Sequence, residues 1–119
     1  MRDFRDIKAW HKAHSLVLSV YDATRQFPDD ERYGLTSQIR RASASIPANI
    51  AEGCGKGSDA ELARFMQISM GSASELEYHL LLARDLHYLN NTTYDDLHSR
   101  TVEVKKMLAP FIKTLRNRK

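Results

Sequence analysis

Residues 35–53, LTSQIRRASASIPANIAEG, decide the fold of this chain because they form one predicted helix with two different stripes. A polar row of five side chains runs beside an apolar face, and both repeat at the three- and four-residue steps of a helix. The apolar face is Leu35, Ile39, Ala42, Ile46, Ile50 and Gly53, and the polar row is Gln38, Arg41, Ser45, Asn49 and Glu52. Since a free surface helix needs no ordered polar row, we expect these side chains to meet partners. Pro47 removes one backbone hydrogen bond and predicts a kink.

Three further amphipathic segments surround this helix, and short turns with Pro, Gly, Asn or Asp separate them. The chain of 119 residues is expected to form one domain, residues 1–119, because its length is typical of a single core. The predicted helices cover about 7–26, 35–53, 59–89 and 93–116. Alternating, β-branched runs that would indicate strands are missing. The sequence therefore predicts an all-α fold, an antiparallel up-down-up-down four-helix bundle.

The first helix has a predicted core row at three- and four-residue steps, and the predicted helix starts have polar caps. The row is Trp10, Ala13, Val17, Val20, Thr24 and Phe27. Asp6 is the expected N-cap of this helix, Ser58 begins a capping box, and Thr92 or Thr93 is expected to cap the last helix. Several apolar residues fall outside the predicted core rows: Leu16, Met66, Met70, Leu81, Leu82, Met107 and Ile112. Because a small bundle has little room for them, we expect a homo-oligomer.

Two runs of small residues stand near the middle of neighbouring helices. Residues 42–45 read Ala-Ser-Ala-Ser, and residues 71–74 read Gly-Ser-Ala-Ser. Small side chains let helix backbones approach closely, so we expect these two runs to pack against each other.

Charge is spread unevenly although the net charge is only +3. The segment 100–119 has seven basic residues and one acid, whereas the segment 58–89 has five acids and two bases. This pattern is compatible with intramolecular charge matching and solubility, or with a surface that binds a polyanion. The candidate nucleic-acid-binding residues are Arg40, Arg41, Lys105, Lys106, Lys113, Arg116 and Arg118.

The polar row of residues 35–53 also allows two interpretations. It could form a network between helices or subunits that fixes their register, with Gln38, Arg41, Ser45, Asn49, Glu52, Ser72 and Glu75 as its expected members. Alternatively, Arg40, Arg41 and Asn49 could line a cleft that touches nucleic acid, because arginine pairs bind phosphate well. In the first case, Glu75 and Glu77 are the available acids for the two arginines.

Residue types that carry catalysis or bind metal do not occur in a usable pattern. None of the five histidines follows a glutamate by three residues, which is the spacing of di-iron sites in bundles. Glu75 and His79 lie four apart, but no second pair matches them. Cys54 is the single cysteine and has no base nearby in the sequence. We therefore expect no enzymatic activity, cofactor, metal or small-molecule substrate.

The expected location is the cytoplasm. No apolar run approaches the ~20 residues that span a bilayer, and the start of the chain, MRDFRDIKAW, lacks the apolar centre of a signal peptide. A lone cysteine agrees with a reducing compartment.

Nearly the whole chain resembles the bacterial four-helix bundle proteins, some of which are encoded in intervening sequences of 23S ribosomal RNA genes. The matching pieces are DIKAWHKAHSLVLSVY, the FP turn followed by acids and YGL, SQIRRASASIPANIAEG, ELARFMQISMGSASELEYHL and LHYL. The resemblance implies the bundle fold and a homopentameric ring. It also relates the chain to accessory variability determinant proteins of retroelements, which are basic partners of a reverse transcriptase and bind nucleic acid.

These observations favour a non-enzymatic homo-oligomer that binds structured RNA, DNA or a ribonucleoprotein through basic surfaces. The alternative is a structural scaffold or protein-interaction ring without a nucleic-acid role. The chain is less basic than the retroelement proteins, so the two hypotheses need separate tests.

Overall fold

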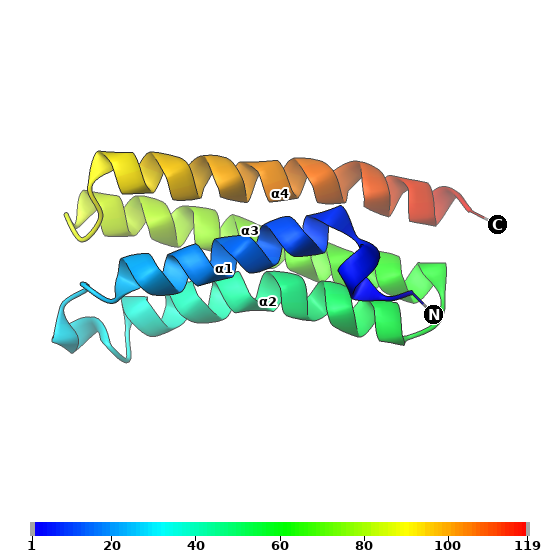
Figure 1. Ribbon diagram of the computed structural model, residues 1–119, viewed down its shortest axis with the longest axis horizontal. Coiled ribbons are helices and arrows are strands. Elements are labelled where there is room, and N and C mark those ends of the chain that lie inside the picture. The colour runs from blue at the N-terminus through cyan, green and yellow to red at the C-terminus, as the bar shows by residue number, and fades with distance from the viewer. Residues whose placement is uncertain (1, 119) are drawn as a thin grey trace.

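A computed structural model describes residues 2–118 as four long helices that lie side by side (Figure 1). The helices are α1 (Lys8–Thr24), α2 (Leu35–Gly55), α3 (Asp59–Asp85) and α4 (Asn91–Asn117), and the short 3-10 turns are η1 (Phe4–Asp6) and η2 (Asp29–Glu31). The described residues contain no strand, so the predicted all-α class with four helices is confirmed. The molecule measures 49 × 22 × 19 Å.

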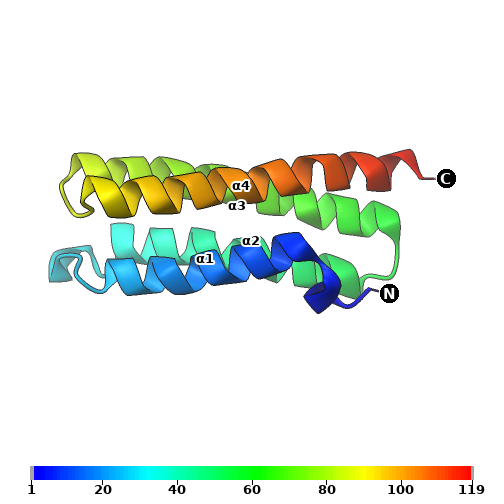
Figure 2. The ribbon, with the colours of Figure 1, turned by 45° about the horizontal axis from the view of Figure 1, so that its top comes forward.

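The two ends of this rod carry different parts of the chain. Each turn sends the chain back along the bundle, and the N and C marks lie at one end, beside the turn between α2 and α3 (Figure 1). We call this the terminal end. The opposite end, called the loop end, holds η2 and the turn between α3 and α4. Figure 2 shows α1 and α2 on one side and α3 and α4 on the other.

The core row predicted for α2 is confirmed at every position, from Leu35 to Gly53. Ile39, Ile46 and Ile50 are fully enclosed because this face points between the other three helices. The helix continues through Pro47, whose ring is itself buried. The apolar face of residues 35–53 thus lies at the centre of the fold.

The core row predicted for α1 is wrong by one residue at two positions. Trp10 and Val17 are only half-buried, and Ala9 and Leu16 take their places inside. The sequence of α1 contains two apolar rows that lie one residue apart. The row that faces the core has Ala9 where the predicted row has Trp10. The Trp10 ring instead covers η1, with its centroid 4.8 Å from that of Phe4, and stacks on His14.

The surplus apolar residues expected outside the core lie in it or pack against it. Leu16, Met66 and Ile112 are buried, and the other four are half-buried. These residues therefore give no support to a subunit contact. The large hydrophobic side chains that are exposed form a different set: Leu18, Tyr21, Tyr33, Ile68, Tyr78 and Leu86.

Two of the three predicted helix caps differ from those in the structure. Asp6 belongs to η1, and Ile7 precedes α1 without a side-chain cap. Asn90, rather than Thr92 or Thr93, caps α4 by accepting from the Thr93 amide at 2.7 Å. Its short amide side chain is a stronger N-cap than threonine. The predicted cap at Ser58 is confirmed, since its hydroxyl accepts from the Glu61 amide at 3.1 Å.

Helices α2 and α3 meet along a seam of small and polar side chains. Ser69 donates to the carbonyl oxygen of Ile46 at 2.8 Å, and Ser72 donates to the hydroxyl of Ser45 at 2.9 Å. Nearer the terminal end, a Cβ on Gly53 would lie 2.9 Å from the Phe65 Cβ. The expected contact between the small runs is present at Ser45 and Ser72. Gly71 is exposed, and a Cβ at this position would meet no atom within 4 Å.

Candidate nucleic-acid interface

The seven basic candidates do not form one patch. Arg40 and Arg41 lie on α2, and the other five lie on α4. Arg40 is turned toward α1, where its Nε donates to the Thr24 hydroxyl at 2.8 Å and its guanidinium lies 4.8 Å from the Tyr21 ring centre. Arg41 is exposed. Arg40 thus helps to hold α1 against α2.

Lys105 has a structural partner on the neighbouring helix. Its ammonium donates to Glu77 of α3 at 2.9 Å, and the ring of His98 lies 3.1 Å from the same carboxylate. The hydrogen bond from Lys105, and secondarily the one with His98, holds the pKa of Glu77 below its usual range. The expected pairing of Glu75 and Glu77 with Arg40 and Arg41 is not formed, because Glu77 faces α4. Lys105 therefore links α3 to α4.

Three basic residues of α4 form an exposed cationic run. Lys106 and Lys113 are two helical turns, about 10 Å, apart on the outer face, and both are exposed. No acid within residues 2–118 forms an ion pair with either one. Arg116 follows one turn later, and its Nη1 lies 3.4 Å from the Gln67 side-chain oxygen. We call Lys106, Lys113 and Arg116 the cationic run.

The terminal end extends this positive surface, and two of its basic residues, Arg2 and Lys56, are not among the candidates predicted from the sequence. Arg2 and Arg118 both approach the single carboxylate of Asp59, each at 3.4 Å, so one acid is shared between two guanidinium groups. Lys56 lies in the turn after α2 with its ammonium 5.6 Å from the Phe65 ring centre. Only the fold shows this grouping, because the residues come from three distant parts of the chain.

The loop end has the opposite charge. Its acids outnumber its bases and come from α1, η2, α3 and α4: Asp22, Asp29, Asp30, Glu31, Asp85, Asp95 and Asp96. Glu31 is used internally, since its carboxylate accepts from the Leu35 amide at 3.1 Å and from the Tyr88 hydroxyl at 3.0 Å. The molecule is therefore charged with opposite signs at its two ends, and the net charge of +3 hides this division.

Only part of the predicted polar row becomes a network. Ser45 bonds to Ser72, and the Asn49 amide donates to the Ser45 hydroxyl at 2.9 Å. Gln38, Arg41 and Glu52 are exposed, and none forms a hydrogen bond between side chains within residues 2–118. Glu75 is also exposed, and its carboxylate lies 3.8 Å from Nδ1 of the buried His79. The network at the centre of the α2–α3 seam thus consists of short side chains.

Two features bear on the chemistry of the described residues. No three His, Cys, Asp or Glu side chains in residues 2–118 come close enough together to hold a metal ion. Cys54 is buried, and burial raises the pKa of its thiol, which disfavours the reactive thiolate. In the same part of the chain, no helix is long and apolar enough to cross a membrane.

These features define a small four-helix protein with a division of charge between its ends. The chain belongs to the family of 23S rRNA-intervening sequence proteins, whose model matches residues 5–110. It is similar in structure to a Bacteroides thetaiotaomicron protein of unknown function from the S23 ribosomal protein family, with a TM-score of 0.81 and 24% identity. That likeness covers 88% of this chain and 95% of the other, and it supports the fold. None of the curated proteins compared with the chain matches it.

Proposed function

We propose that this protein is a non-enzymatic, homo-oligomeric, up-down-up-down bundle of the bacterial cytoplasm that binds structured RNA or duplex DNA through its terminal end. The observation that carries this proposal is the cationic run, whose two lysines are exposed on α4 and form no ion pair with an acid among residues 2–118. Phosphate groups bind such unpaired cations and release counterions in doing so. The family's name, which refers to 23S rRNA, makes a structured ribosomal RNA fragment the natural first probe.

Arg2, Lys56 and Arg118 at the terminal end support the same interface. A polyanion that displaces Asp59 from its two arginines gains two further cations close to the cationic run. Because no exposed aromatic row accompanies these residues, backbone contacts rather than base stacking are expected to dominate. Binding should therefore depend strongly on salt and only weakly on sequence.

The test is a fluorescence anisotropy titration of a labelled ribosomal RNA helix and of duplex DNA at several salt concentrations. The double variant Lys106→Gln/Lys113→Gln should bind more weakly, and its salt slope on duplex DNA should fall by about 1.8, which is ~0.9 for each lost phosphate contact. The matched control is Arg25→Gln/Arg32→Gln, which removes the same charge at the loop end. Equal weakening of binding in both double variants would show that binding responds to net charge alone. Absence of binding at low salt would contradict the proposal.

Homo-oligomerisation is supported by exposed apolar side chains away from the loop-end cleft between α1 and α4, particularly Tyr33 at 87% and Tyr78 at 59% exposure. Where such side chains come together in one contiguous patch, they mark an interaction surface. Light scattering coupled to size-exclusion chromatography should give the mass of five 13.6 kDa chains, as the family resemblance implies. A mass of 13.6 kDa at micromolar concentration would contradict this part of the proposal.

The same exposed side chains favour the alternative function, a scaffold that binds proteins without nucleic acid. A pull-down from nuclease-treated lysate separates the two functions, because a partner that survives nuclease treatment does not require RNA. Retention of such a partner by a variant with the Lys106→Gln/Lys113→Gln changes would favour the scaffold. Loss of the partner protein after nuclease treatment would favour the nucleic-acid interface.

A further inference from the structure

A cleft of about 430 Å³ opens between α1 and α4 at the loop end, away from the cationic run. Leu18 and Ala23 of α1 line one side of it, and Leu89 of the α3–α4 turn and Leu97 of α4, both almost fully buried, line the other. Leu18 is 60% exposed although it borders this cleft, so the bundle itself does not cover it. Leu18 is thus the main apolar contact that this largely polar cleft offers to a partner.

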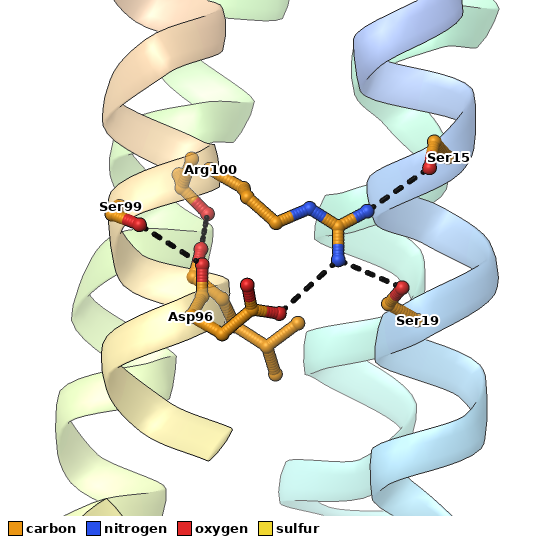
Figure 3. Close-up of polar contacts among 7 residues, drawn as sticks. Ser15, Ser19, Asp96, Ser99 and Arg100 are labelled. Carbon is orange, nitrogen blue, oxygen red and sulfur yellow. Dashed lines mark hydrogen bonds and ion pairs between the residues drawn. The ribbon is translucent and has the colours of Figure 1, made fainter. Parts of the chain in front are cut away.

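Two carboxylates line the same cleft from opposite helices. Asp22 comes from α1, and its only ion pair within residues 2–118 is a weak one to Arg25 at 3.8 Å, with both side chains largely exposed. Asp96 comes from α4 and pairs with Arg100 at 3.2 Å. Figure 3 shows Arg100 reaching from α4 to the hydroxyls of Ser15 and Ser19, at 3.0 and 2.8 Å, which fixes its guanidinium beside Asp96.

The geometry points to a docking site for a partner protein at this cleft, one that offers a segment of interleaved leucine-like and lysine or arginine side chains. Leu18 would contact a hydrophobic side chain and the long stems of the basic ones, while Asp22 and Asp96 would bind their charged heads. Asp29 and Asp30 in η2 and Asp95 in α4, which form no ion pair within residues 2–118, extend the complementary charge around the loop end. Nucleic acid is excluded as the occupant because its phosphates would be repelled here.

A second copy of the chain fits this cleft less well than a different protein. Its basic terminal end supplies charge, but the rings beside its cations, Phe111 next to Arg2 and Phe65 next to Lys56, are half-buried and buried in their own bundle. Such an end could satisfy the carboxylates without covering Leu18. The required partner combines basic and apolar side chains in one segment, as an amphipathic basic helix does.

The probe for this site is a labelled 14-residue peptide with leucines at helical spacing and lysines or arginines between them, titrated against the full chain. The variant Asp22→Asn/Asp96→Asn should weaken binding by about tenfold or more, which is typical for loss of charged hydrogen bonds. Asp22→Asn alone should give part of this loss while leaving Arg100 and its serines in place. Leu18→Ser should also weaken binding by about tenfold, because a leucine contact is removed.

The matched control is Asp6→Asn/Glu52→Gln, which removes two exposed acids nearer the terminal end. This double should bind the peptide within about twofold of the unchanged protein, since neither acid borders the cleft. Equal weakening in control and cleft variants would overturn the site in favour of general charge attraction. Equal binding of a peptide with glutamine in place of its basic residues would overturn it too, as would salt-sensitive self-association that Asp22→Asn/Asp96→Asn abolishes.

Discussion

Replacement of Gly53 by alanine tests whether the close seam between α2 and α3 is as tight as described. A Cβ at this position would lie 2.9 Å from the Phe65 Cβ, 3.0 Å from the Leu62 Cδ1 and 3.2 Å from the Leu62 Cα. The last of these atoms is backbone, so a side-chain rotation cannot relieve the contact. We expect overpacking to cost about 1–3 kcal/mol.

The effect of helix propensity has to be separated from this cost, because alanine favours a helix over glycine by up to ~1 kcal/mol. Gly55 supplies the control: it stands in the same last turn of α2, and its Cβ would meet nothing within 4 Å. Gly55→Ala should therefore be neutral or slightly stabilising. The informative quantity is the difference between the two variants, which we expect to be about 1–3 kcal/mol.

Urea denaturation followed by far-ultraviolet circular dichroism measures this difference, with all proteins at one concentration so that association contributes equally. Gly71→Ala on α3 serves as a second control, since its Cβ also meets nothing within 4 Å. If Gly53→Ala is as stable as Gly55→Ala, the two helices have enough freedom to move apart. Gly53 would then not be required for the close approach of α2 and α3.

Three other perturbations have defined outcomes. Ile46→Ala should lower the free energy of unfolding by about 2–5 kcal/mol in urea, because its side chain is fully enclosed. Ser58→Ala should cost about 0.5–2 kcal/mol through loss of the α3 cap, whereas no loss would show that another group satisfies the Glu61 amide. The lowered pKa of Glu77 stabilises the fold above the ordinary glutamate pKa of 4.5, and this contribution is lost as pH falls through the lower folded value. Glu77→Gln should therefore flatten the acid side of a stability–pH curve, and an unchanged curve would contradict the role of Lys105.

Hydrophobic spacing was sufficient to predict the helices and most of the core. It worked best on α2, where one apolar face leaves a single choice for the inner row. On α1, two rows one residue apart satisfy the same spacing, and the size of Trp10 does not reveal that Ala9 takes the inner position. Packing of the other helices decides this, so spacing alone placed the tryptophan incorrectly.

The site was less predictable because charge pairing depends on which helices become neighbours. Lys105 and Lys106 are adjacent in sequence, but the rotation of 100° between them gives one a carboxylate on α3 and leaves the other in water. Similarly, Arg2 and Lys56 join the terminal end only through the fold. The division between a cationic and an acidic end could be suspected from the uneven composition of α4, but its extent required the arrangement of all four helices.

The opposite charges at the two ends of a rod 49 Å long have a physical consequence beyond any single contact. They give the protein a permanent electric dipole directed along its long axis. In the field of an extended polyanion, this dipole experiences a torque that turns the terminal end forward before the surfaces meet. Encounters would then begin end-on, while the acidic loop end points outward and stays available to another molecule.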